Sequence, residues 1–194
     1  MRYFCRQIVK DNMPEYDIAK ELAKLHTLSG AAYSKQVERI ARKGLFHPVE
    51  GEHNIYSAIG DSSKDYESLL NAARKAVSHG YKVYILPNPS GTKTPDFIFE
   101  RKGVFRIFEL KTIQGVSSVS NRLSDSGSQS NHVLLNLTTR YNGGLLAVQI
   151  RAYFEQNPQA TEVLIFKGKS VISIKRSFII QNDFIRKFRR EYGK

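Results

Sequence analysis

Apolar side chains recur at three- and four-residue intervals in several segments of the chain, a pattern that predicts amphipathic helices. The first such segment, residues 14–44, is interrupted near Ser29-Gly30. A later helix is expected to begin at Asp61-Ser62-Ser63, because Asp and Ser cap helix N-termini, and to end at Gly80. Further helical character is predicted at residues 115–132 (weak), 145–156 and 178–192.

Short runs rich in Val, Ile, Tyr and Phe, bounded by turn residues, predict strands between these helices. The predicted strands are 81–86, 96–100, 104–112, 133–137, 162–166 and 171–174. The resulting order, α-β-β-β-α-β-α-β-β-α, indicates an α/β (α+β) fold with a mixed central sheet flanked by helices. Because Gly and Pro punctuate residues 44–60, we predict a loop-rich stretch there that forms a boundary or a lid. It would separate a small N-terminal helical segment at 1–60 from a main domain at 61–194.

Composition narrows the class of protein. Hydrophobic residues make up 41% and charged residues 25% of the 194 residues, which is typical of a folded, water-soluble chain. No apolar run approaches the roughly 18 residues that a membrane-spanning helix needs, and the N-terminus lacks the apolar stretch of a secretory signal. The single cysteine, Cys5, excludes an intrachain disulfide framework and a cysteine-rich zinc site.

The charge of the chain indicates a partner. Thirty Lys and Arg against 18 Asp and Glu give a formal net charge of +12, and most of the excess lies after residue 99. Such a field attracts polyanions, so nucleic acid is the first partner to consider, an acidic protein the second and an anionic membrane surface the third.

Three charged residues in the predicted strands form the main candidate site. Glu109 and Lys111 lie two positions apart in a strand, so their side chains point to one face of an otherwise apolar segment. Asp96 opens the preceding strand, and an antiparallel hairpin would bring it beside Glu109. The alternatives are an exposed cross-strand salt bridge for Glu109 and Lys111, and a turn residue after proline for Asp96.

Two carboxylates that converge beside a lysine suit a hard divalent cation, Mg²⁺ or Mn²⁺, and Zn²⁺ stays open as an alternative. The metal would be bound by Asp96 and Glu109, together with the Leu110 carbonyl, and would polarise a phosphodiester and activate a water. Lys111 would orient or deprotonate that water, or stabilise charge on the phosphate. Glu67, on the helix before the strands, is a candidate fourth member of the site, or else a solvated helix residue.

These residues resemble the PD-(D/E)xK nuclease superfamily. Pro95-Asp96, followed after twelve residues by Glu109-Leu110-Lys111, is similar to the motif of that superfamily, and helix, strand, strand, strand, helix, strand is its core order. The resemblance covers roughly residues 62–140. It also implies a role for Gln129, which is similar to the glutamine that follows the lysine in resolvase-like members.

A closer resemblance is to the C-terminal toxin domains of bacterial contact-dependent growth-inhibition proteins, many of which cleave tRNA. The matching segments are Gly80–Val83, Thr94–Phe97, Glu109–Thr112, and Gln129 before Val133–Leu135. The resemblance implies a bacterial toxin domain that acts on RNA in the cytoplasm of a target cell, delivery as part of a larger secreted protein, and a cognate acidic immunity protein. Residues 1–60 would then be an entry or linker segment.

Several further residues are candidates for contact with nucleic acid. Thr112 follows the lysine and would bind phosphate or merely favour the strand, and His132 begins a later strand near Gln129. The closing helix presents Arg186, Lys187, Arg189 and Arg190, a phosphate-contacting face or a solvated one.

Three other functions remain compatible with this sequence. A DNA endonuclease of the resolvase or restriction type would use the same metal site. A metal-independent ribonuclease would use His and Lys, and a non-catalytic nucleic-acid binder would retain only the fold. Intact Asp96, Glu109 and Lys111 argue against the last, because buried charges are costly to keep without a function.

Overall fold

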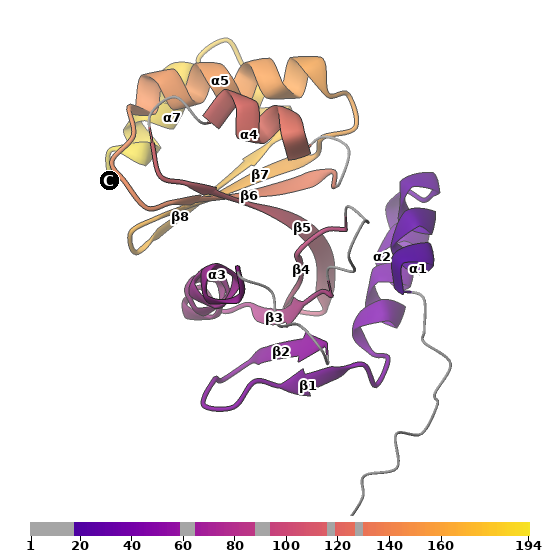
Figure 1. Cartoon of the computed structure of the whole chain (residues 1–194). Helices are drawn as coiled ribbons and strands as arrows, with labels where there is room; N and C mark the ends of the chain where they lie inside the picture. Colours follow the sequence, from indigo (N-terminus) through magenta and orange to yellow (C-terminus); the bar gives the residue numbers. More distant parts are fainter. Residues whose placement is uncertain (1–17, 59–64, 88–93, 116–118, 127–129) are drawn as a thin grey trace, which may run out of the picture.

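A computed structural model describes residues 18–58, 65–87, 94–115, 119–126 and 130–194 (Figure 1). The elements, in chain order, are α1 (Ile18–Lys24), the 3₁₀ turn η1 (Leu25–Thr27), α2 (Gly30–Ala41), β1 (Phe46–Pro48), β2 (Ile55–Ala58), α3 (Tyr66–Ser78), β3 (Lys82–Ile85), β4 (Phe97–Arg101), β5 (Val104–Ile113), α4 (Val119–Ser126), β6 (His132–Leu137), α5 (Gly143–Gln156), β7 (Glu162–Lys167), β8 (Ser170–Lys175), α6 (Arg176–Ile179) and α7 (Phe184–Tyr192). Six of the eight strands are those expected from the sequence, so the predicted mixed α/β fold is confirmed.

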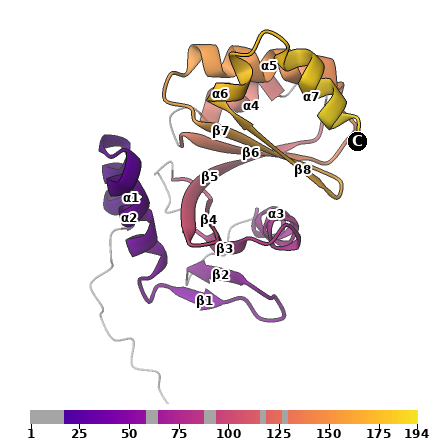
Figure 2. The same ribbon diagram turned by 180° about the vertical axis from the view of Figure 1, so that it is seen from behind.

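The described strands form one sheet in which each strand pairs with its neighbours in the sequence. Strand β2 runs parallel to β3, and β5, β6 and β7 run parallel to one another, whereas the remaining pairs are antiparallel. Figures 1 and 2 show that the sheet curves strongly at β5. Helices α4, α5, α6 and α7 cover β6–β8, while α3 and the α1–α2 pair lie on opposite sides of β3–β5.

Strand β5 belongs to all three hydrophobic cores. Its last residue, Ile113, packs with α4, α5 and α7, and Phe108 packs with α3. Phe105 and Ile107 pack with α1 and α2. Side chains of one ten-residue strand are therefore buried by different helices, and the stretch from Leu110 to Thr112 is less deeply buried than the residues directly before it.

Two expectations differ from the structure. Residues 44–60 contain strands β1 and β2, so the stretch is not simply loop. Strand β1 is short, ends at Pro48 and lies at the edge of the sheet, where a residue without an N–H is tolerated. The expected helix at 178–192 is divided into α6 and α7, because the chain turns at 180–183.

The expected boundary near residue 60 falls at residues 59–64, outside the described part of the chain. On either side of it, Ile55 of β2 pairs with Val83 of β3, so the sheet extends from the N-terminal segment into the main domain. Residues of α1 and α2 also share a core with β3, β4 and β5.

Candidate active site

The predicted hairpin brings Asp96 to Glu109. Phe97 of β4 pairs with Phe108 of β5, which makes Asp96 and Glu109 the next facing pair. The main-chain N–H of Asp96 donates to the Phe108 carbonyl oxygen at 3.2 Å, and the N–H of Leu110 donates to Oδ2 of Asp96 at 2.7 Å. Both bonds cross between the same two segments, so the Asp96 side chain is held against the middle of β5.

Glu109 and Lys111 point to the same side of β5, as the alternation of a strand predicts. Lys111 Nζ lies 2.7 Å from Glu109 Oε1, and the side chains are 13% and 5% exposed, respectively. This burial distinguishes the pair from an exposed salt bridge on a sheet face, which is the alternative reading of the sequence. Removing two charges from water costs several kcal/mol per ion, and one lysine offsets the charge of only one carboxylate.

The pKa of Asp96, the second carboxylate, reflects this imbalance of charge. The pKa of Asp96 is raised from 3.8 to about 8, chiefly because burial disfavours the charged form and secondly because Glu109 is negatively charged nearby. The Leu110 N–H and Lys111 act in the opposite direction but do not cancel these effects. Near neutral pH the Asp96 carboxyl therefore retains a proton. A bound cation would take the place of this proton and neutralise the carboxylate instead.

A cavity of about 410 Å³ opens beside these residues. Its walls come from α3, the Asp96 segment, the second half of β5 and α4, and the lining residues are Asp65, Ser68, Leu69, Asp96, Leu110, Lys111, Thr112, Gln114, Gly115 and Arg122. Glu109 adjoins this cavity through its bond to Lys111. Acidic, basic and hydroxyl side chains thus converge on one cavity.

Helix α3 contributes a different acidic residue from the one expected. Glu67 is 84% exposed at its side chain, lies 4.0 Å from Arg74, and does not line the cavity. Asp65 and Ser68 do line it. Asp65 precedes the first residue of α3, whereas Glu67 lies in its first turn with its side chain directed toward Arg74 and solvent. The structure therefore places Asp65, and not Glu67, at the wall of this cavity.

Thr112 reaches the site. Its Oγ1 lies 3.2 Å from Oγ of Ser68, which joins β5 to α3 at the wall of the cavity. One of these hydroxyls donates to the other, so the hydroxyl that accepts this bond keeps its own hydrogen for a bound anion. Gln129 lies outside the described residues.

His132 is not part of this cavity. Its ring is 5.5 Å from that of Phe108 and 6.2 Å from that of Tyr33, and in register His132 lies one position before Val133, the partner of Glu109. Burial, followed by the positive charge of Arg106, lowers the pKa of His132 to about 4. The imidazole is therefore neutral at physiological pH, and the half-buried ring lies between those of Phe108 and Tyr33.

The basic residues of α7 also lie away from the cavity. Arg186 and Lys187 pair with Asp183 at 3.0 and 3.1 Å. Together with Arg189 and Arg190, they belong to a helix that packs against α5, and none of the four lines the cavity that holds Asp96. The structure does not bring this predicted face together with Asp96 and Lys111.

Four cavity residues were missed by reasoning from the sequence: Asp65, Ser68, Gln114 and Arg122. A signal existed for Ser68 and Asp65, since Ser68 directly precedes the apolar Leu69 and Asp65 lies four residues, about one helical turn, before it. Gln114 and Arg122 stand in a polar stretch with no periodic pattern that would single them out.

The donors present fit a hard, oxygen-preferring cation. Asp96, Glu109 and Asp65 offer carboxylate oxygens, and burial together with the nearby Glu109 raises the pKa of Asp96, an effect that a bound cation would oppose. Among the described residues there is no group of three or more His, Cys, Asp or Glu side chains close enough to hold a metal ion together. Mg²⁺ commonly binds through one or two carboxylates and completes its shell with water and substrate oxygens, whereas protein zinc sites usually supply three or four ligands.

Comparison with known proteins gives little beyond this geometry. No family model matches the chain, and no curated protein matches it either. One solved structure, the CdiA-CT/CdiI toxin and immunity complex from Burkholderia pseudomallei, aligns with 60% of this chain and 92% of its own, with a TM-score of 0.41 and 19% identity. At that level of likeness the alignment assigns no function to the chain.

The described residues contain no helix that is both long and apolar enough to cross a lipid bilayer.

Proposed function

We propose that the chain is a divalent-metal-dependent endonuclease, with RNA favoured over DNA as its substrate. The observation that supports this most directly is the meeting of Asp96, Glu109 and Lys111 beside one cavity. The Leu110 N–H bonds to Asp96 at 2.7 Å, Lys111 bonds to Glu109 at 2.7 Å, and the pKa of Asp96 is about 8.

In this proposal, each residue has a chemical task. Asp96 and Glu109 bind Mg²⁺ or Mn²⁺, and Asp65, which lines the same cavity, accepts hydrogen bonds from the waters that complete the metal shell. The cation supplies the positive charge that polarises a phosphodiester and acidifies water. Lys111 stabilises the negative charge that develops on the phosphate and orients the attacking water. The hydroxyl of Ser68 or Thr112 that accepts their mutual hydrogen bond donates its own hydrogen to a remaining phosphate oxygen.

The biological role follows from the sequence motifs. Their resemblance to growth-inhibition toxin domains supports a bacterial toxin that cleaves RNA, tRNA above all, in the cytoplasm of a target cell after delivery within a larger secreted protein. A toxin of net charge +12 would be neutralised by an acidic immunity protein, since opposite charges speed association.

Cleavage assays test the proposal. The chain is incubated with total tRNA, other RNA and plasmid DNA in Mg²⁺, Mn²⁺, Zn²⁺ or EDTA, beside Asp96→Ala and Lys111→Ala. Lys35→Ala, an exposed position on α2, is the matched control. We expect metal-dependent cleavage of tRNA that both site variants lose and the control retains.

Each alternative has its own outcome in this assay. Cleavage that persists in EDTA would exclude the metal mechanism and indicate a metal-independent ribonuclease. Cleavage of DNA in preference to RNA would indicate an enzyme of the resolvase or restriction type. Toxicity on expression in a bacterium, relieved by co-expression of an acidic protein encoded next to the chain, would support the toxin role.

A further inference from the structure

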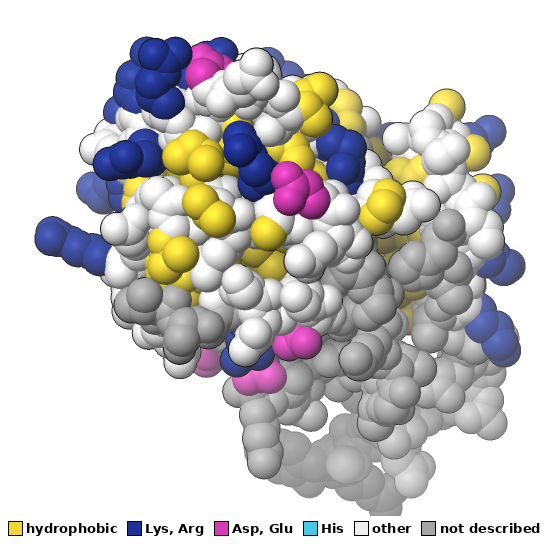
Figure 3. Space-filling model, turned by 90° about the horizontal axis from the view of Figure 1, so that it is seen from above, with side chains coloured by type: hydrophobic (Ala, Val, Ile, Leu, Met, Phe, Trp, Pro, Cys, Tyr) yellow, Lys and Arg dark blue, Asp and Glu magenta, His cyan; other side chains and the backbone are white. Residues whose placement is uncertain are grey.

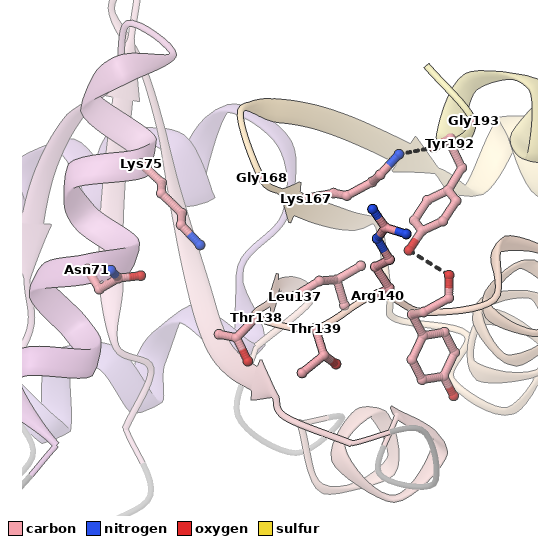
Figure 4. A pocket seen from close by; sticks show the side chains of 11 residues that line it. Asn71, Lys75, Leu137, Thr138, Thr139, Arg140, Lys167, Gly168, Tyr192 and Gly193 are labelled. Atoms are coloured by element: carbon pink, nitrogen blue, oxygen red, sulfur yellow. Dashed lines mark hydrogen bonds between the residues drawn. The ribbon is translucent and has the colours of Figure 1, made fainter.

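A second and larger cavity, of about 800 Å³, lies beyond the candidate active site (Figure 4). Its lining comes from four separate segments of the chain: Asn71 and Lys75 of α3; Leu137, Thr138, Thr139, Arg140 and Tyr141 at and after the end of β6; Lys167 and Gly168 at the end of β7; and Tyr192 and Gly193 near the C-terminus.

The charge of this lining has one sign. Three of the lining side chains are basic (Lys75, Arg140 and Lys167), and no Asp or Glu stands among the described residues that line it. Figure 4 shows these three side chains extending from α3, from the segment after β6 and from β7 toward a shared space. Two threonines and an asparagine add polar groups. The cavity therefore suits an anion that presents several oxygen atoms.

Hydrogen bonds and ring contacts hold the basic groups in place. Lys75 Nζ donates to Oδ1 of Asn136 at 2.7 Å. Lys167 Nζ lies 4.5 Å from the centroid of the Tyr192 ring and donates to the Tyr192 carbonyl oxygen. The Tyr192 hydroxyl in turn donates to the Tyr141 carbonyl at 3.0 Å. Because the two lysines are already ordered, less side-chain entropy would be lost when a ligand binds.

Tyr192 itself depends on the absence of a side chain at Gly143. A Cβ at this position would lie 2.6 Å from Cδ1 of Tyr192, closer than real Cβ contacts allow. The close approach sets the ring beside Lys167 and fixes one wall of the cavity.

The basic cavity and the active-site cavity are neighbours along both the sheet and α3. Thr112, in the first cavity, pairs in register with Asn136, which accepts the bond from Lys75 in the second. On α3, Ser68 lines the first cavity, and Asn71 and Lys75 line the second. Seven helical residues at about 1.5 Å each place Ser68 and Lys75 about 10 Å apart along the axis. That length is about three nucleotide steps of one strand at 3.4 Å each.

The basic cavity also lies at a part of the sheet where α/β folds commonly bind ligands. Strands β5, β6 and β7 are parallel, so their carboxyl ends meet at one edge of the sheet. Thr138 donates through its N–H and its hydroxyl to the Ile113 carbonyl, at 3.1 and 2.9 Å, which joins the ends of β5 and β6 there. Crevices outside the carboxyl ends of parallel strands are frequent binding sites in open α/β sheets.

We infer that the cavity formed by Lys75, Arg140 and Lys167 binds the phosphate backbone of a polynucleotide on one side of the scissile bond. The inference rests on the proposed function only for where the bond is cut, because the binding itself follows from the charge and shape of the cavity. It assigns the polyanion to this cavity rather than to α7, where Asp183 already neutralises part of the positive charge of Arg186 and Lys187.

Binding of a short oligonucleotide tests the inference without any need for cleavage. The probes are fluorescein-labelled single-stranded RNA and DNA of about 12 nucleotides, a length within the usual range of single-strand sites. Fluorescence anisotropy in EDTA compares the whole wild-type chain with Arg140→Gln and Lys167→Met. Arg190→Gln, which removes the same charge from α7, is the matched control, and a thermal melt of each variant verifies folding.

We expect Arg140→Gln to weaken binding about tenfold and to reduce the slope of log K against log salt by about 0.7, the value for one lost contact on a single strand. Arg190→Gln should change affinity less than about twofold, because it lies outside the cavity. Tighter binding of RNA or of DNA would identify the polymer, and either supports the inference. Because Arg140 is exposed and outside the cores, its variant stays informative if Lys167→Met fails to fold.

Three results would overturn the inference: wild-type affinity in Arg140→Gln, an equal loss in Arg190→Gln, or no binding of either polymer. Failure of the nuclease proposal would look different. In that case Arg140-dependent binding would persist while no metal ion supported cleavage of any substrate.

Discussion

The main-chain N–H of Leu110 donates a 2.7 Å hydrogen bond to the side chain of Asp96, the residue that precedes β4. Leu110 is flanked by Glu109 and Lys111, so Asp96 is fixed to the peptide that lies between the other two members of the site. The geometry of all three residues therefore depends on one hairpin register, and small changes in that register would disperse the site.

Replacement of Asp96 by Asn removes the charge of the side chain but preserves its shape. Asp96→Asn keeps an oxygen that can accept the Leu110 N–H but removes the negative charge that a cation requires. We expect cleavage under single-turnover conditions to fall at least about 100-fold, comparable with the loss of other groups that stabilise transition-state charge. The variant should remain folded by circular dichroism. Cleavage within about twofold of wild type would contradict the assignment of Asp96 as a metal ligand.

The same residue predicts how stability depends on pH in the absence of metal. Its pKa is about 8 in the folded protein and 3.8 in the reference state, so the folded state binds more protons between these values. Its contribution to stability is therefore fully present below about pH 4 and is lost as pH rises through about 8. In EDTA, the melting temperature of the wild type should fall by several degrees between about pH 6 and pH 9, since 1 kcal/mol corresponds to about 2–4 °C in a chain of this size.

Asp96→Asn is the control for that measurement. Because Asn does not titrate, the melting temperature of this variant should change less over the same range. If the melting temperatures of the two proteins changed equally with pH, the pH dependence would belong to groups other than Asp96.

Metal ions should compete with the proton on Asp96. Stabilisation by a ligand grows with the ratio of its concentration to its dissociation constant, and a carboxyl that must first lose a proton binds metal more weakly at low pH. The rise in melting temperature on addition of Mn²⁺ should therefore be larger at about pH 8.5 than at pH 6.5, and EDTA should reverse it. Glu109→Gln should abolish the rise at both values. An Mn²⁺-dependent rise in melting temperature that is the same at both pH values would show that the metal does not compete with the proton on Asp96.

Lys111→Met tests the role of the ammonium group separately from metal binding. The substitution preserves most of the apolar stem but leaves Glu109 without the positive charge at 2.7 Å. Cleavage should fall about 100-fold or more, while affinity for Mn²⁺ stays equal or increases, because a repelling charge has been removed. Lys35→Met, at an exposed position of α2, serves as the control. A parallel loss of metal affinity and cleavage would mean that Lys111 acts only by supporting the site.

The sequence predicted the central site because its geometry is local. Strand alternation sets Glu109 and Lys111 on one side, and a two-residue turn at Lys102-Gly103 sets the register that brings Asp96 to them. Both Lys102 and Gly103 have positive φ values, 54° and 76°, as tight turns of this kind require.

The rotation of α3 about its axis could not be predicted in the same way. The apolar residues of this helix, from Tyr66 to Val77, form a stripe along one side, and Glu67 and Ser68 both lie at its margins. A small rotation of the helix decides which of these two residues faces β5. The basic cavity is harder still, since Lys75, Arg140, Lys167 and Tyr192 come from four segments that only the folded chain joins. The positive charge of the closing helix was conspicuous in the sequence, but it lies elsewhere.

Asp65, which precedes α3, and Glu67, in its first turn, provide a matched pair of acidic residues at the start of one helix. Asp65→Asn removes a carboxylate from the cavity while Asn preserves the capping preference at the start of α3. We expect it to raise the Mg²⁺ concentration needed for half-maximal cleavage about tenfold. Glu67→Gln should leave that concentration within about twofold of wild type, because Glu67 faces Arg74 and solvent. The reverse order of effects would return Glu67 to the site and show that α3 rotates when metal and substrate bind.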